Sequence, residues 1–274
     1  MSSNVGSVRT GAVVVWHSAE AHVERLRDGF KLLNLERYTP AGRSKYTAML
    51  EAVKKYHSGR QYIVRPLEGR KGFEVTEEIK GSDMNEHKHV VSYIFLGDDS
   101  VTNSPYDQSQ LDGLLAIYAE KIGLCSPKDL TSAVADVIVK DLRGLCLKDG
   151  GAVYWVAGEC IPKLFDVEKA VNAAAPSFQL SVFRHEMTDR EKASVVVAAT
   201  REMKERAAKI TEDVTSGELK ECALRNRERE CEGLMELAKF YESELSVSMQ
   251  EILDAIESTK VAASAAAIMM SASN

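Results

Sequence analysis

The sequence predicts an α+β protein, in which a mixed, partly antiparallel sheet with flanking helices precedes a C-terminal antiparallel helical hairpin of coiled-coil type. Short β-branched runs alternate with amphipathic segments up to about residue 186, a pattern typical of strands and helices that share one core. Beyond that point the apolar residues recur at helical spacing only. We therefore expect an α+β domain over 1–186 and a helical hairpin over 187–274.

The chain is expected to begin with a buried strand. Residues 11–16 are apolar and mostly β-branched, as in a strand that is covered on both faces. Ser18 follows them and is expected to cap a helix that runs to about Leu35. Apolar residues at steps of three and four predict a second helix over 44–56.

The middle of the chain changes character. Three short segments, 61–66, 72–79 and 89–96, are separated by glycine-containing turns and predict an antiparallel meander, with a loop over 97–105. Helices over 107–122, 127–147 and 161–173 and strands over 152–156 and 178–183 complete what we expect to be one mixed sheet with its helices.

The C-terminal third shows the strongest pattern. Thr188 and Glu191 have the spacing of a capping box and should begin a helix that ends near Val214. After a turn, a helix of more than forty residues should fill the rest. Its apolar and small residues alternate at steps of three and four, which predicts a heptad seam: Cys231, Leu234, Ala238, Tyr241, Leu245, Ser248, Ile252 and Ile256. The seam can pack on the preceding helix or on a second copy of the chain, and both remain open.

Composition describes an ordinary globular chain with uneven charge. Of 274 residues, 45% are hydrophobic and 28% charged, and the net charge is −6. Residues 1–80 carry 14 Lys/Arg against 9 Asp/Glu, whereas the remainder carries 21 against 32. A basic front and an acidic rear favour contact with an acidic partner or head-to-tail association.

Cysteine usage indicates a reducing compartment. The five cysteines are odd in number and form no Cys-x-x-Cys pair, which argues against a disulfide framework or a zinc knuckle. The apolar runs near both ends are too short for a signal-peptide core or a membrane span. We expect a cytoplasmic protein, in the host cytoplasm if a phage encodes it, with no membrane partner.

Sequence motifs predict no cofactor. Neither the phosphate-binding loop nor the dinucleotide fingerprint occurs. A metal- or thiol-dependent enzyme remains an alternative on two grounds. His87 and His89 share one face of a strand and could bind metal with Glu86 or Asp83. Cys160 could act as a nucleophile if His185 were its base.

The basic front supplies a further alternative. Lysine and arginine side chains interleaved with tyrosines can bind nucleic acid through phosphate contacts and base stacking. The candidate contacts lie on the first two predicted helices and at their ends: Arg25, Arg27, Lys31, Arg43, Lys45, Lys54 and Lys55.

Three segments, 14–18, 43–50 and 151–157, with the sequences Val-Val-Trp-His-Ser, Arg-Ser-Lys-Tyr-Thr-Ala-Met-Leu and Gly-Ala-Val-Tyr-Trp-Val-Ala, resemble a family of uncharacterised bacterial and bacteriophage proteins that is defined as a domain of unknown function. The resemblance covers roughly residues 11–215. It implies a bacterial or phage origin and brings no catalytic residues.

The first hypothesis on function is therefore a non-enzymatic interaction or assembly protein of a bacterium or phage. It would self-associate as a homo-oligomer, or bind a protein partner, through its C-terminal helices. Nucleic-acid binding by the basic helices and metal- or thiol-dependent catalysis are the alternatives.

Overall fold

The computed structural model describes residues 10–59, 61–80, 85–96, 100–148, 153–216 and 219–272. It confirms the α+β class, because antiparallel sheets with helices are followed by helices that pack together. The chain forms two compact units, of which the first comprises 1–17, 134–169 and 179–274 and the second 18–133 and 170–178. The expected division between residues 186 and 187 is drawn from secondary structure and stays a prediction.

The sheet of the first unit has its earliest strand in the middle. Strand β1 (Thr10–His17) pairs antiparallel with β10 (Gln179–Glu186) on one side and β9 (Val153–Ala157) on the other, and β8 (Leu145–Cys146) extends the β9 edge. Ala12 and Val14 of β1 are fully buried. The expected buried strand at 11–16 is therefore present, and late segments of the chain supply its neighbours.

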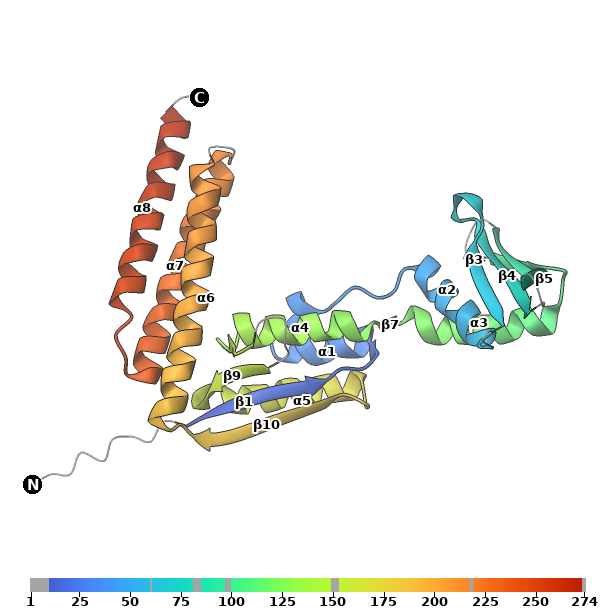
Figure 1. Ribbon diagram of the computed structural model, residues 1–274, viewed down its shortest axis with the longest axis horizontal. Helices are drawn as coiled ribbons and strands as arrows, with labels where there is room; N and C mark the ends of the chain where they lie inside the picture. Colours follow the sequence, from blue (N-terminus) through green and yellow to red (C-terminus); the bar gives the residue numbers. More distant parts are fainter. Residues whose placement is uncertain are drawn as a thin grey trace, which may run out of the picture. The chain divides into compact units, whose positions relative to one another are not determined.

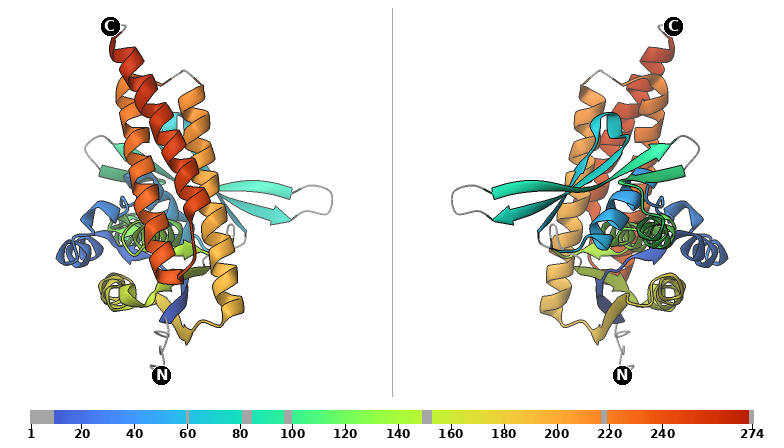
Figure 2. Two further views of the ribbon diagram at one scale, coloured as in Figure 1. Left: turned by 90° about the vertical axis from the view of Figure 1, so that its left-hand side faces the viewer. Right: turned by 90° about the vertical axis from the view of Figure 1, so that its right-hand side faces the viewer.

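The second unit contains its own antiparallel sheet, in the order β3-β4-β5-β6. Phe73, Val75, Val91 and Tyr93 of this sheet pack with Met49 and other buried side chains of two helices. Beyond the residues that pair with β3 and β6, the distal parts of β4 and β5 pair only with each other and extend as the ribbon visible in Figure 2. The bounds are β3 (Tyr62–Pro66), β4 (Gly72–Lys80), β5 (Asn85–Leu96), β6 (Ser100–Ser104), α2 (Lys45–Tyr56) and α3 (Gln108–Ile122).

The remaining described elements are two short strands, three 3₁₀ helices and the helices α1, α4 and α5. Short strands β2 and β7 pair with each other, and single-turn 3₁₀ helices lie at Glu36–Tyr38, Glu68–Arg70 and Gly158–Cys160. The bounds are α1 (Val23–Leu32), β2 (Ala21–His22), β7 (Leu124–Cys125), α4 (Pro127–Lys140) and α5 (Ile161–Ala174).

The structure corrects the expected single mixed sheet. The described strands form separate sheets, and every pairing between them is antiparallel. The expected loop over 97–105 contains the strand β6, which closes the meander as its fourth strand. Antiparallel neighbours can be joined by a short hairpin, whereas parallel strands need a long crossover connection. The short connections between β3, β4, β5 and β6 therefore favour a separate antiparallel meander.

Two expected helix limits also differ. Helix α1 begins at Val23, so Ser18 does not cap it, and the Ser18 hydroxyl instead donates to the carbonyl oxygen of Pro127 at 2.7 Å. Helix α4 ends at Lys140 rather than near residue 147, because Arg143 takes a positive φ of 49° and the chain then enters β8. A left-handed residue terminates an α-helix.

The C-terminal region forms a bundle of α6 (Asp189–Thr215), α7 (Glu221–Leu245) and α8 (Gln250–Ala272), which run alongside one another in Figure 2. Thr188 and Glu191 form the expected capping box at the start of α6. The expected helix of more than forty residues is broken into α7 and α8, because Ser246 adopts a left-handed conformation with φ 47°. The Glu242 carboxylate accepts a 3.1 Å hydrogen bond from the Met249 amide just beyond the break.

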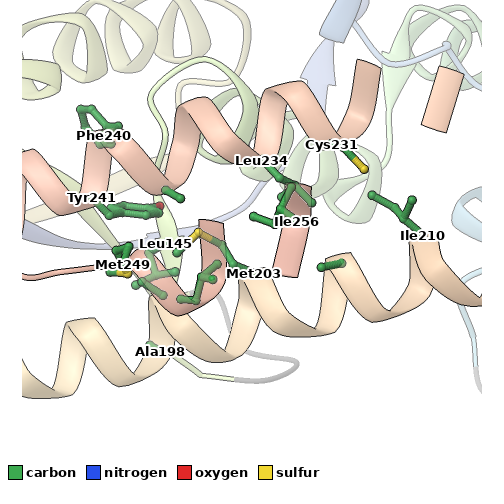
Figure 3. Packing of buried hydrophobic residues seen from close by; sticks show 14 of the residues in the cluster. Leu145, Ala198, Met203, Ile210, Cys231, Leu234, Phe240, Tyr241, Met249 and Ile256 are labelled. Carbon is green, nitrogen blue, oxygen red and sulfur yellow. The ribbon is translucent and has the colours of Figure 1, made fainter. Parts of the chain in front are cut away.

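The bundle and one edge of the first sheet share a core. Side chains from the bundle, among them Met203, Leu234, Tyr241 and Ile256, pack together with Leu145 of β8, as Figure 3 shows. Trp155 and Ala157 of β9 belong to the same cluster. The helices are therefore anchored on the sheet of their own unit.

Candidate interaction surfaces

The predicted heptad seam lies inside the bundle of this chain. Seven of its eight members are buried, with Leu245 and Ile256 fully so, whereas Ser248 is exposed in the connection between α7 and α8. Met249 is buried there in its place. The seam therefore contributes to the stability of the bundle, and its seven buried residues are Cys231, Leu234, Ala238, Tyr241, Leu245, Ile252 and Ile256.

Helix α8 carries a second seam on its outer face. Its buried residues recur at 252, 256, 259, 263 and 267. At 100° per residue, Ser258, Val261, Ala265 and Ile268 lie on the opposite side of the same helix, again at steps of three and four. All four are exposed, including 59% of Val261 and 68% of Ile268. The outer α8 seam, as we call these four residues, is a heptad-spaced stripe of small and apolar side chains open to solvent.

From Val261 onward, the outer α8 seam lacks charge on its flanks. After Lys260, the helix contains no Asp, Glu, Lys or Arg up to its last residue, Ala272. Met269 beside the seam is 70% exposed. Large apolar side chains that cluster on a solvent-facing helix mark an interaction site. None of the helices in the described residues combines the length and the apolar character that a membrane crossing requires.

The basic candidates for nucleic-acid contact are distributed over separate helices. Arg25, Arg27 and Lys31 lie on α1, whereas Lys45, Lys54 and Lys55 lie on α2, and residues 33–44 connect the two helices, which Figure 1 draws apart. Arg27 pairs with Glu24 at 2.6 Å and Lys55 with Glu120 at 3.3 Å. No specific contact within the described residues favours a phosphate-binding function for them.

Arg43 is an internal group. Its side chain is 6% exposed and pairs with Glu20 and with Glu51, whose carboxylate lies 2.8 Å from the Arg43 Nε. Lys121 donates to the same Glu20 carboxylate at 2.8 Å. Burial alone would raise the pKa of Glu20, but the hydrogen bonds and charges of Lys121 and Arg43 lower it. The network holds the segment before α2 in place and keeps Arg43 from the surface.

The two histidines of the metal hypothesis lie on β5. His89 makes a 3.0 Å hydrogen bond with Ser92, and His87 stands opposite Glu78 of β4. Asp83, the other acid considered, lies outside the described residues. Within the part of the chain that the structure describes, no group of three or more His, Cys, Asp or Glu side chains is arranged to hold a metal ion.

Cys160 lies at the end of the 3₁₀ turn that leads into α5. Burial raises the pKa of its thiol, with a further contribution from the charge of Glu159. A raised pKa keeps the thiol protonated, which is the reverse of what a nucleophilic cysteine requires. The side chain of His185, the expected base, is outside the described residues.

Sequence reasoning missed Val261, Ala265 and Ile268. Their signal was present, since the steps of three and four from Ser258 to Ile268 run in parallel with those of the buried seam. Only the structure separates the two stripes, because it shows which one faces α6 and α7.

Comparison with known proteins gives no significant match: none to a family model, none to a curated protein and none to a solved structure. The resemblance to the bacterial and bacteriophage family stays a prediction, and function is inferred from the described side chains alone.

Proposed function

We propose that this chain is an interaction or assembly protein that associates with a second copy of itself through the outer α8 seam. The observation that carries the proposal is the exposed, uncharged and heptad-spaced stripe of Val261, Ala265 and Ile268 on the side of α8 that faces away from its own bundle. A seam of this kind is stabilised by knobs-into-holes packing against another helix.

A second copy fits this surface because the seam is complementary to itself. In an antiparallel pair centred on Ala265, Val261 of one copy faces Ile268 of the other, and the small Ala265 side chains meet at the two-fold axis. Such an interface is isologous and closes as a dimer. Because residues 261–272 carry no charged side chain, the paired segments place no like charges against each other, which would cost binding free energy.

The free energy gained by burying the exposed side chains, compared with the entropic cost of association, predicts a weak dimer. Val261, Ile268 and Met269 are each about two-thirds exposed. Burying six such side chains from two copies gains roughly 6–12 kcal/mol, at ~1–2 kcal/mol each. Lost translational and rotational freedom costs at least ~4 kcal/mol. The difference corresponds to a dissociation constant in the micromolar range or weaker.

The proposed location is a bacterial cytoplasm, or the host cytoplasm if a phage encodes the chain. The five cysteines are free, and burial raises the pKa of Cys125, Cys160 and Cys231. Protonated, unpaired thiols persist in a reducing compartment.

The experiment is mass measurement by light scattering from about 1 to 200 µM, a range that brackets the expected dissociation constant. We expect the mass to rise from monomer to dimer. Ile268→Asp should stay monomeric, whereas Val197→Asp should dimerise, because Val197 is also 68% exposed but lies on α6. A wild-type mass that stays monomeric throughout, or an Ile268→Asp chain that still dimerises, would overturn the proposal.

Cross-linking tests the antiparallel arrangement. In a Cys222→Ser background, which removes the exposed thiol, a mixture of Val261→Cys and Ile268→Cys chains should form a disulfide-linked dimer. Each variant alone should not, because identical positions lie apart in an antiparallel pair. Efficient cross-linking of Ile268→Cys alone would instead indicate a parallel pair.

A further inference from the structure

An open groove of about 660 Å³ lies on the surface of the first unit, between α6 and α7. Ile210 of α6 and Leu234 of α7 are buried beneath it, and the half-buried Leu237 continues this apolar floor by one turn. Lys140, in the last turn of α4, also lines it. None of the lining residues belongs to α8, so the groove is separate from the outer α8 seam.

The rim of the groove is cationic. Lys140, Arg206, Lys209 and Arg227 line it together with one acid, Glu230. This concentration of positive charge is unusual for its place in the chain, because residues 81–274 carry 21 Lys/Arg against 32 Asp/Glu. A positive surface within an otherwise acidic region favours a negatively charged partner.

The rim cations are accessible to such a partner. Arg227 pairs with Asp213 at 2.9 Å and with Glu230 at 2.5 Å, and Lys140 pairs with Asp136 at 2.8 Å. Arg206 pairs with Glu202. The side chains of Lys140 and Arg206 are exposed and that of Arg227 is half-buried, and ion pairs at such partly or fully exposed sites contribute little and exchange readily. Lys209 is exposed and makes no ion pair among the residues that the structure describes.

Gly233 is a second, independent indication. It lies in the interior of α7, where glycine is unfavourable compared with alanine. A methyl group added there would meet no heavy atom within 4 Å, so packing inside this chain does not account for the glycine. A glycine on the wall of a groove lets another backbone approach closely.

We propose that this groove binds an amphipathic α-helix of a partner protein, with an apolar stripe against Ile210, Leu234 and Leu237 and acidic residues along its flanks. Helix-in-groove recognition uses apolar anchors at i, i+3 or i+4 and i+7. Two adjoining helices with an apolar floor offer the holes for such anchors, and the four rim cations select acidic flanks. This site is independent of the proposed self-association.

The test uses two labelled synthetic helices, measured by fluorescence anisotropy with the full chain. Both carry Leu at the heptad seam, one with Glu and the other with Lys at the flanking positions. We expect the Glu-flanked helix to bind at least about tenfold more tightly than the Lys-flanked helix, with a preference that falls as salt rises. Equal affinity for both helices, or binding of neither, would overturn the proposal.

Variants locate the site. Lys209→Glu should weaken binding of the Glu-flanked helix by about tenfold, whereas Lys204→Glu, on an exposed position of the same helix that does not line the groove, should leave it within about twofold. Gly233→Trp should abolish binding, and Gly233→Ala should have a small effect. Unchanged binding by Gly233→Trp would exclude this groove.

Two controls separate the alternatives. Sodium decanoate tests for a small anionic amphiphile, and binding of decanoate without binding of the helix would overturn the proposal of a protein partner. The Ile268→Asp chain should bind the Glu-flanked helix as wild type does, since its change lies on α8. Failure of self-association therefore does not affect this result.

Discussion

The phenolic hydroxyl of Tyr241 on α7 donates a 2.9 Å hydrogen bond to the backbone carbonyl of Arg143, just before β8. The Tyr241 ring lies 6.3 Å from that of Trp155 on β9, and the Arg143 guanidinium stacks 4.9 Å from the ring of Phe240. Burial raises the pKa of Tyr241, so its hydroxyl remains a donor at any physiological pH. These contacts join the bundle to the sheet of the same unit.

Removing the Tyr241 hydroxyl should weaken this junction. Tyr241→Phe keeps the ring and loses one hydrogen bond, and we expect the free energy of unfolding to fall by about 0.5–1.5 kcal/mol. Tyr241→Ala should cost about 3–5 kcal/mol, because a large buried side chain is removed. Urea unfolding measures both. Tyr106, which is 68% exposed, provides the control, and equal stabilities of Tyr106→Phe and Tyr241→Phe would contradict the assigned bond.

Leu245→Asp and Ile268→Asp should differ sharply in thermal stability. Leu245 is fully buried and Ile268 is 68% exposed. An unpaired carboxylate in an apolar core costs several kcal/mol, so Leu245→Asp should lose the cooperative thermal transition of the bundle. Ile268→Asp should melt as the wild-type monomer does at low concentration. Thermal melting followed by circular dichroism tests both variants. A melting curve like that of wild type for Leu245→Asp would show that the buried seam is misassigned.

Gly233→Ala should stabilise the chain. The added methyl group meets no neighbour, and alanine in a helix interior is favoured over glycine by about 0.5–1 kcal/mol. Gly144→Ala is the opposite case, because its methyl group would approach the Ile138 side chain within 2.4 Å. Chemical denaturation should therefore give a higher free energy of unfolding than wild type for Gly233→Ala and a lower one for Gly144→Ala. A destabilised Gly233→Ala would show that α7 packs differently.

Acid should destabilise the network around Glu20. Its folded-state pKa is lowered from 4.5, so its contribution to stability is present above about pH 4.5 and is lost as the pH falls through the folded-state pKa. Glu20→Gln removes the titration and should flatten the decline in stability between neutral pH and about pH 3. Denaturant midpoints across that range test this, and identical slopes for variant and wild type would refute the role of Glu20.

Features set by local chemistry were predictable from sequence. Thr188 accepts an amide hydrogen bond from Glu191 at the start of its helix, as the spacing of the two residues predicts, whereas the cap expected at Ser18 does not form, because α1 begins only at Val23. The break at Ser246 was not predictable, because apolar spacing continues from Leu245 to Met249 and Ile252 without interruption. A heptad pattern therefore does not distinguish one long helix from two that pack on each other.

Long-range pairing was harder to infer. Nothing local in residues 100–104 reveals that they pair with 92–96, or that β1 pairs with both β9 and β10, because strand partners depend on contacts far apart in sequence. The interaction surfaces posed the same difficulty. The spacing of Val261 and Ile268 is visible in sequence, but the face that remains uncovered is defined only once α8 packs on α7.

The central place of β1 has a consequence for synthesis on the ribosome. Residues 10–17 emerge from the ribosome well before their hydrogen-bonding neighbours, 153–157 and 179–186, are translated. At the usual elongation rates of ~5–20 residues per second, this nascent strand waits on the order of ten seconds. Residues 18–133, which make up most of the other unit, are synthesised well before then, so the apolar segment 10–17 stays available to chaperones while the residues that follow it fold.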